Sequence, residues 1–317
     1  MSDGTGEARP VEARGLVKRY GEIVAVNDVD LTVERGDVFG YLGPNGAGKT
    51  TSLRMLLGLI RPTAGEARLF GRDPLTDGAR ALDGVAGFVE GPRFYPYMSG
   101  RKNLRLLADL DGGHPPGRID EVLEIVELRN RAKDRVGGYS HGMRQRLGIA
   151  ASLLREPQLL LLDEPATGLD PAGMRDMREL IKRLASNGIT ILLSSHILAE
   201  VEELCNRVAI IRRGTIIYQG RLDALLESAA SGFRIRVSDP DRALDLLNDH
   251  PGIGSVSRAD GHVRFQSDEA SLGAATVALG RAGIGITELV PQTTSLEELF
   301  LTMTGGETSD ADSAATA

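Results

Sequence analysis

Short apolar runs alternate with amphipathic stretches along most of the chain. Four consecutive leucines occupy positions 159–162 between polar residues, and such a run is typical of a strand that is buried on both faces of a parallel sheet. Ile189–Leu193 has the same character, and the helical pattern of 174–187 between the two runs ends at Gly188. This alternation predicts an α/β domain with a mostly parallel sheet.

Further strand-like and helix-like segments lie in the first two thirds of the chain. The pattern predicts short strands, the first three in an antiparallel sheet, at 13–18, 23–27, 29–34, 66–70 and 86–89. A helical region from Ser99 to Leu128 is interrupted at 111–117, where two prolines and three glycines predict a loop. A helix after Ser140 and a strand pair at 208–219 complete this predicted domain.

The pattern changes after Gly220, where a linker helix is predicted over residues 221–232. The following segments alternate as strand, helix, strand, strand, helix and strand, at 233–237, 243–248, 253–259, 262–266, 270–282 and 284–290. That order predicts a small α+β domain of the ferredoxin-like type over 233–304, with a last helix at its end. The first domain is predicted at 13–220, and residues 1–12 and 305–317 are predicted to be disordered.

The composition limits the classes of partner. The 317 residues are 41% hydrophobic and 26% charged, as in ordinary globular proteins. A net charge of -7 leaves no basic excess to neutralise phosphates, so nucleic acid is not expected as a partner. One cysteine, Cys205, fits a reducing compartment. The polar N-terminus predicts no secretory signal, and no apolar run is long enough to span a membrane.

One glycine-rich stretch carries the clearest chemical signal. The pattern G-x-x-x-x-G-K-[ST] is matched by Gly43, Pro44, Asn45, Gly46, Ala47, Gly48, Lys49 and Thr50. A strand is predicted before it and a helix from Thr51 after it, so backbone N–H groups and the helix dipole would favour a bound phosphate. We expect Lys49 to reach the β- and γ-phosphates, Thr50 to offer its hydroxyl to Mg²⁺, and Thr51 to belong to the same site. The alternative is a glycine-rich surface turn.

Two acids and a histidine follow the buried strands directly. Because ligands of open α/β sheets bind at the carboxyl ends of strands, we expect Asp163 to hold Mg²⁺ through water. Glu164 is expected to polarise an attacking water. His196 follows the next buried strand and is expected to touch a γ-phosphate. The alternatives are a solvated acidic pair in a turn and a structural histidine.

In this order the motifs resemble the nucleotide-binding subunit of ABC transporters over about residues 13–220. Besides the phosphate loop (Walker A), the resemblance rests on Tyr139–Met143 with Arg144-Gln145-Arg146 (signature), Leu159–Glu164 (Walker B), Gly168-Leu169-Asp170 (D-loop) and Ser195-His196 (switch histidine). It implies a P-loop ATPase with ATP and Mg²⁺ as cofactors and Glu164 as the catalytic carboxylate. Tyr20 matches the aromatic residue that stacks on adenine; the alternative is a core or turn aromatic.

The resemblance also implies that two such domains close head-to-tail around two ATP molecules. Ser140 and Gly142 would then contact the γ-phosphate of ATP held on the opposite subunit. The signature here reads Tyr-Ser-His-Gly-Met instead of Leu-Ser-Gly-Gly-Gln. His141 and Met143 thus replace a glycine and a glutamine, and we expect a weaker or pH-sensitive contact across the dimer.

A second departure is Glu90, which stands where the family usually has glutamine. That glutamine links Mg²⁺ and the attacking water to the membrane partner. We expect Glu90 to take over this catalytic and metal-binding position while adding a negative charge beside Mg²⁺. ATP hydrolysis is expected to survive with an altered dependence on Mg²⁺.

Residues 90–100 hold three aromatic side chains in a chain with only 4% aromatic residues. In the family this segment borders a groove that receives a cytoplasmic helix of the membrane subunit; the alternative is a packed loop. Together with Glu90 and the C-terminal domain, it resembles the subgroup that serves ABC-2 type exporters, among them drug- and bacteriocin-resistance systems. The resemblance implies an ATPase subunit at the cytoplasmic face of the cell membrane. It would work as a homodimer with a separate integral-membrane permease and export a drug, antibiotic or peptide.

Two other hypotheses stay open at this point. The chain could be a non-transport ABC ATPase that acts on ribosomes, DNA or a metal-cluster scaffold. Translation-factor relatives usually carry two ATP sites, and this chain has one Walker A motif; DNA-repair relatives have a long coiled coil, for which no heptad run is found. Alternatively, the C-terminal domain could be a regulatory module, although a dimer-stabilising appendage is preferred. The cargo and the permease are not predicted.

Overall fold

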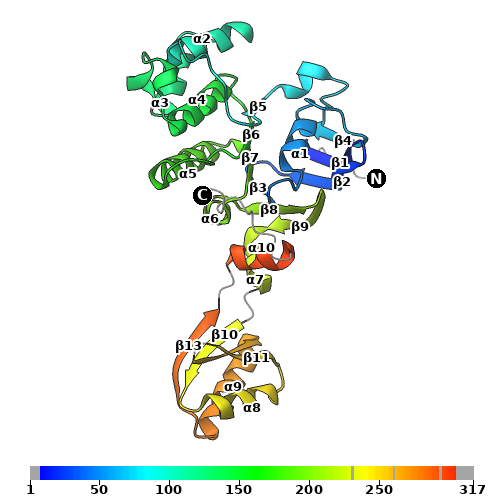
Figure 1. The fold of residues 1–317 in the computed structure, drawn as a ribbon, viewed down its shortest axis with the longest axis vertical. Helices are drawn as coiled ribbons and strands as arrows, with labels where there is room; N and C mark the ends of the chain where they lie inside the picture. Colours follow the sequence, from blue (N-terminus) through cyan, green and yellow to red (C-terminus); the bar gives the residue numbers. More distant parts are fainter. Residues whose placement is uncertain (1–7, 230–231, 260, 293–294, 305–317) are drawn as a thin grey trace, which may run out of the picture. The chain divides into compact units, whose positions relative to one another are not determined.

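The computed structural model describes residues 8–229, 232–259, 261–292 and 295–304 (Figure 1). The chain divides into two compact units: the described part of residues 1–221 together with Thr304 forms the first, and the described part of 222–303 forms the second. The disorder that the sequence predicts for 1–7 and for 305–317 falls outside the described residues.

The first strand corrects the predicted start of the ordered chain. Strand β1 (Val11–Tyr20) includes Val11 and Glu12, which the sequence placed in a disordered N-terminus. Val11 is fully buried because it lies between Val33 and Leu69 of the two neighbouring strands. An apolar side chain at the middle of a sheet stabilises the pairing of the strand's first residues.

A small antiparallel sheet contains β2 (Ile23–Val33), β1 and β4 (Ala64–Leu69), in that order. The sequence predicts two strands where the structure has the single strand β2. The register shifts between the Leu16–Val29 and Lys18–Val26 pairs, and Asp28 there has a left-handed φ of 54°. This bulge lets the strand continue past the polar residues that suggested a break.

A six-stranded sheet forms the centre of the first unit. Its order is β5 (Val85–Phe88), β6 (Leu159–Asp163), β7 (Thr190–Ser195), β3 (Val38–Leu42), β8 (Arg207–Arg212) and β9 (Thr215–Arg221). The first five strands are parallel and β9 is antiparallel. The four leucines of β6 are completely buried, as the apolar run predicted. The carboxyl ends of β3, β6 and β7 therefore meet at one edge of the sheet.

Helices cover this sheet and form a separate helical part. The helices of the first unit are α1 (Lys49–Leu56), α2 (Gly100–Leu110), α3 (Arg118–Ile125), α4 (His141–Leu153), α5 (Pro171–Ser186) and α6 (Leu198–Leu204). Short 3₁₀ turns lie at Gly78–Leu82, Arg129–Arg131 and Val136–Gly138. Figure 1 shows α2, α3 and α4 together on one side of the six-stranded sheet, and the small antiparallel sheet with α1 on the other.

The second unit has the ferredoxin-like order that the sequence predicted. Its elements are α7 (Leu222–Ala229), β10 (Gly232–Val237), α8 (Pro240–Asn248), β11 (Ile253–Ala259), β12 (His262–Ser267), α9 (Glu269–Arg281), β13 (Ile286–Gln292) and α10 (Leu296–Thr304). The strands pair antiparallel in the order β11-β12-β10-β13. Ile235, Val263 and Phe265 pack with Leu247 and Leu279 in its core. Within the described ranges, no helix is both long and apolar enough to cross a membrane.

Candidate functional site

The glycine-rich loop connects β3 to α1 as the sequence predicted. Gly48 precedes the first helical residue with a φ of 109°, no side chain caps the helix start, and no acid lies in its first turn. A Cβ atom at Gly48 would lie 2.5 Å from the carbonyl oxygen of Ala25, so only glycine fits. The uncapped helix start is therefore suited to an anion. A pocket of about 170 Å³ lies over it, lined by Ala25, Pro44 to Thr51 and Glu164.

Lys49 connects the loop to the acidic end of β6. Its side chain is buried, and Nζ donates a hydrogen bond to the carbonyl oxygen of Gly43 at 2.6 Å. The same Nζ lies 3.2 Å from Oε1 of Glu164. The lysine thus places its positive charge between the phosphate pocket and the candidate catalytic acid.

Thr50 and Asp163 provide the oxygen atoms that a magnesium site needs. Thr50 Oγ1 donates to Asp163 Oδ2 at 3.0 Å, and the hydroxyl of Ser194 donates to Asp163 Oδ1. Mg²⁺ prefers such oxygen ligands and usually takes one or two carboxylates together with phosphates and water. The donor set therefore fits Mg²⁺ next to a bound nucleotide.

Glu164 is fixed by contacts on all its polar groups. Its N–H donates to Ser194 Oγ at 3.0 Å, and its Oε2 accepts a hydrogen bond from Thr167 Oγ1 at 2.6 Å and contacts His196 Nδ1. Burial acts to raise the pKa of Glu164, but the hydrogen bonds from His196 and Thr167 and the charge of Lys49 outweigh it and bring the pKa to about 2. Glu164 is therefore a carboxylate at physiological pH.

His196 lies beside Glu164, as the strand-end argument predicted. The hydrogen bond to Glu164 raises the pKa of His196, and burial opposes this change. The imidazole therefore holds the Glu164 carboxylate through its Oε2 atom, while Lys49 contacts the other oxygen, Oε1. A contact between His196 and a γ-phosphate stays a prediction.

Glu90 is held by two separate contacts. Its backbone N–H donates to Asp163 Oδ2 at 3.3 Å, and its carboxylate forms an ion pair with Arg54 of α1. The residue has a left-handed φ of 65°, a conformation that costs free energy in a non-glycine residue. The arginine neutralises the extra negative charge that the sequence predicted beside the metal. A direct role of Glu90 in catalysis or metal binding stays a prediction.

The Arg54–Glu90 pair leads to a first testable expectation. In the Arg54→Gln variant the Glu90 carboxylate loses its partner and should attract the metal. An added attraction of about 1 kcal/mol between the carboxylate and Mg²⁺ would lower the Mg²⁺ concentration for half-maximal ATP hydrolysis about fivefold. Glu90→Gln should raise that concentration. The measurement is a Mg²⁺ titration of ATP hydrolysis at fixed ATP.

Arg105→Gln removes the same charge from the exposed side of α2 and is the matched control for that titration. The double variant Arg54→Gln with Glu90→Gln should resemble Glu90→Gln alone, since the arginine acts through the carboxylate. Unchanged titrations in both single variants would show that the Glu90 side chain does not sense the metal.

Tyr20 lies at the end of β1 and is 48% exposed. The Lys18 Nζ atom lies 5.0 Å from the centre of its ring. The exposure contradicts a core aromatic, whereas the alternative of a turn aromatic stays open because a turn follows Tyr20 directly. Tyr20 is not among the residues that line the phosphate pocket, so its stacking on adenine stays a prediction.

Ser140 and Gly142 lie at the start of α4. Ser140 is the residue before the first helical one, and its Oγ accepts a hydrogen bond from the N–H of Met143 at 3.2 Å. Neither residue lines the phosphate pocket of its own chain. This position is compatible with a contact to a nucleotide on a second copy.

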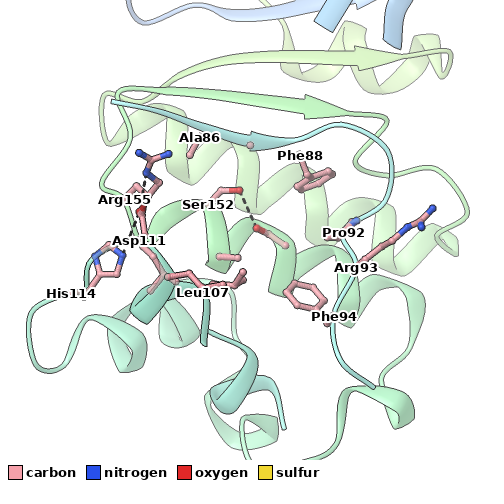
Figure 2. A pocket seen from close by; sticks show the side chains of 15 residues that line it. Ala86, Phe88, Pro92, Arg93, Phe94, Leu107, Asp111, His114, Ser152 and Arg155 are labelled. Carbon is pink, nitrogen blue, oxygen red and sulfur yellow. Dashed lines mark hydrogen bonds and ion pairs between the residues drawn. The ribbon is translucent and has the colours of Figure 1, made fainter. Parts of the chain in front are cut away.

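A groove lies between helices α2 and α4 and the edge strand β5 (Figure 2). It has a volume of about 420 Å³ and is lined by residues of β5, of segment 92–94, of α2 and of α4 with the residues after it. Figure 2 shows Phe88, Pro92 and Phe94 at one end, with Arg93 beside them, and Arg155, Asp111 and His114 at the other. A Cβ atom at Gly148 would lie 2.6 Å from Pro92, so this glycine lets segment 92–94 approach α4.

The aromatic segment that the sequence singled out borders this groove. Phe94 lines it, whereas Tyr95 and Tyr97 are exposed, with ring centres 5.8 Å apart. The packed-loop alternative is therefore wrong for the two tyrosines. Leu110, which also lines the groove, is 77% exposed.

The structure adds functional candidates that the sequence analysis did not single out. They are Ala25, Arg54, Thr167 and Ser194, each in contact with a predicted site residue. Of these four, only Ser194 could have been found from the sequence, because it lies at the carboxyl end of a buried strand, directly before Ser195 and His196. The other three belong to no chemical motif, and their contacts depend on how distant segments meet.

A phosphate loop between a parallel strand and a helix, with two acids at the carboxyl end of another parallel strand of the same sheet, defines a P-loop nucleotide hydrolase. Residues 26–167 match the family model described as ABC transporter. The bacitracin transport ATP-binding protein of Bacillus licheniformis is 40% identical over 94% of this chain and 98% of its own length. The Nod factor export ATP-binding protein I of Burkholderia lata is 36% identical over 95% and 99%. This chain belongs to the ABC transporter family, as an ATP-binding and ATP-hydrolysing member.

A solved structure supports the same fold for the first unit. A dimeric ATP-binding cassette in a post-hydrolysis state, bound to ADP and phosphate, matches with a TM-score of 0.60 and 25% identity. It covers 67% of this chain and 98% of its own length. The family that the motifs suggested is thus confirmed.

Proposed function

We propose that the chain is the ATP-hydrolysing subunit of an exporter for a peptide antibiotic or similar drug. The observation that carries this proposal is the 40% identity to a bacitracin transport ATP-binding protein over nearly the full length of both chains. That similarity includes the ferredoxin-like second unit, which lies beyond the cassette shared with the solved structure. A relative named for Nod factor export supports the direction of transport.

The phosphate pocket binds the triphosphate of ATP. Lys49 and the N–H groups at the start of α1 contact the β- and γ-phosphates. Thr50 and Asp163 would hold Mg²⁺, which would neutralise phosphate charge. Glu164 accepts a hydrogen bond from a water; as the water oxygen bonds to the γ-phosphorus, its proton passes to Glu164 and the bond from the γ-phosphorus to the bridging oxygen breaks, which gives ADP and phosphate. His196 holds the Glu164 carboxylate in the required orientation.

Two identical copies close around two ATP molecules. Ser140 and Gly142 of each copy contact the γ-phosphate bound to the other, which completes each site only in the dimer. ATP binding closes the dimer and hydrolysis opens it. Two observations support this arrangement. No side chain caps the start of α1 at the phosphate pocket, and the start of α4 does not line that pocket in its own chain.

The groove beside β5 receives a short helix of the membrane permease at the cytoplasmic face of the membrane. An amphipathic helix can insert apolar side chains between Phe88, Phe94 and Leu107. The polar end of the groove, with Arg155 Nε 3.0 Å from Asp111 Oδ2, would meet its charged residues. Glu90 and Pro92 connect this groove to the magnesium side of the ATP site, so closure of the dimer moves the permease helix.

Co-purification from detergent-solubilised native membranes tests the proposal. The tagged chain should recover a multi-span membrane protein that lacks its own ATP site. The double variant Leu107→Glu with Leu110→Glu should recover at least about tenfold less, because two charges in an apolar groove cost several kcal/mol. ATP binding by the variant should be unchanged.

Leu59→Glu is the matched control, because Leu59 is an exposed leucine that does not line the groove. It should recover as much permease as the unchanged chain. Recovery of only ribosomal, DNA-bound or scaffold proteins would favour the non-transport ATPase. Recovery that is insensitive to the groove substitutions would show that the permease binds elsewhere.

A further inference from the structure

A continuous series of polar contacts connects the signature segment to the phosphate loop within one chain. His141 Nε2 lies 3.0 Å from the carbonyl oxygen of Thr167. The hydroxyl of Thr167 donates to Glu164 Oε2 at 2.6 Å, and Glu164 Oε1 lies 3.2 Å from Lys49 Nζ. The residue that replaces a glycine of the related signature is thus two contacts away from the candidate catalytic carboxylate.

The chemistry of the partner determines the direction of the first hydrogen bond. A backbone carbonyl oxygen can only accept, so Nε2 of His141 carries the hydrogen and donates it. Gln145, one turn further along α4, is 3% exposed, and its amide nitrogen lies 3.5 Å from the same ring nitrogen. Its Oε1 has no hydrogen-bond partner among the described residues. With the amide turned over, Oε1 would accept from His141 as well.

The loop that receives His141 is fixed at both of its ends. The N–H of Glu164 donates to Ser194, and the Asp170 side chain caps α5 by accepting from the N–H of Gly173 at 2.7 Å. A Cβ atom at Gly168 would lie 3.6 Å from His141 Nε2, so the imidazole packs against this glycine. Between its two ends, the loop accepts a side-chain hydrogen bond from His141 of α4.

We infer that His141, oriented by Gln145, is a positioning residue that fastens the start of α4 to loop 164–170 and thereby sets the position of Glu164. The inference rests on the proposed dimer for its functional consequence. Ser140 and Gly142, which would hold the nucleotide of the other copy, flank His141 directly. When the other copy's nucleotide binds Ser140 and Gly142 and moves the start of α4, Thr167 and Glu164 move with it. Each ATP site of the dimer therefore influences hydrolysis at the other.

Hydrogen exchange of the nucleotide-free monomer tests the attachment itself. The amides of Thr167 and Leu169 bond to Glu164 and Ala166 within the loop. In His141→Gly, peptides covering 164–170 should exchange at least about fivefold faster, since the loop loses one side-chain hydrogen bond. His141→Gln keeps an N–H donor and should exchange nearly as the unchanged chain does.

Steady-state ATP hydrolysis tests the consequence for Glu164. His141→Gly should lower kcat about tenfold while KM for ATP changes less than about twofold, because the residue acts on the orientation of the reacting groups and not on phosphate binding. His141→Gln should restore most of kcat. His250→Gly is the matched control, since Nδ1 of His250 also lies 2.9 Å from a backbone carbonyl, that of Pro251 in the second unit.

Each result has a separate meaning. Unchanged exchange at 164–170 in His141→Gly would overturn the attachment. Faster exchange with an unchanged kcat would overturn the positioning of Glu164. If the unchanged chain does not dimerise with Mg²⁺ and a non-hydrolysable ATP analogue, the proposed dimer and the influence between sites are both wrong, while the exchange result still decides whether His141 holds the loop.

Discussion

Replacement of Glu164 by glutamine should remove most ATP hydrolysis and leave ATP binding intact. Glutamine has the same shape and can still accept from Thr167, but it carries no charge to attract and polarise a water. General-base catalysis contributes typically 10²- to 10⁴-fold, so we expect kcat to fall by about 10³. The measurements are steady-state phosphate release and the dissociation constant of ATP.

The trapped state provides a second readout for this variant. Without hydrolysis, the closed dimer with two ATP molecules should accumulate and be detected by sedimentation. Glu202→Gln makes the same chemical change on the exposed side of α6 and should leave both readouts unchanged. If Glu164→Gln retains a kcat within threefold of the unchanged chain, another group acts on the water.

Substitution of Gly87 by alanine should destabilise the first unit strongly. Gly87 lies in β5 with a φ of 152°, and an added Cβ atom would lie 1.9 Å from the carbonyl oxygen of Leu161 in β6. The clash is with backbone of a fully buried strand, so it cannot be relieved by a side-chain rotation. We expect a loss of about 3 kcal/mol or more in the free energy of unfolding. Thermal or urea unfolding of the full chain measures it.

Gly91 provides the control for this experiment, since nothing lies within 4 Å of a Cβ atom added there. Gly91→Ala should change the free energy of unfolding by about 0.5 kcal/mol or less. Equal stability of the two variants would mean that β5 can move away from β6 without loss. Because Phe88 lines the groove and Glu90 follows the strand, Gly87→Ala should also weaken permease recovery.

The local pattern of the sequence was sufficient for the elements that depend on it alone. The four leucines of β6 are buried on both faces, and the glycine-rich loop lies between strand and helix because its own residues require that geometry. The order of segments after Gly220 was enough to predict the ferredoxin-like unit. Strand ends were also informative, since parallel strands bring Asp163 and His196 to one edge.

Errors arose where a tertiary contact outweighs local preference. Val11 joins β1 because it is buried between two other strands, although it stands between a proline and a glutamate. Strand β2 continues through Asp28 because a bulge in its pairing with β1 absorbs the irregularity. Neither effect can be found from residues that are near in sequence.

Local sequence was enough to identify the candidate side chains of the site, and the structure brings them together: the lysine and threonine of the phosphate loop, the acids after β6 and the histidine after β7. The contacts that neutralise and support these groups became visible only in the folded chain. Arg54 neutralises Glu90, and His141 reaches the loop that holds Glu164. Motifs are visible in sequence because consecutive residues share one backbone geometry, whereas charge pairing and support come from segments that meet only when the chain folds.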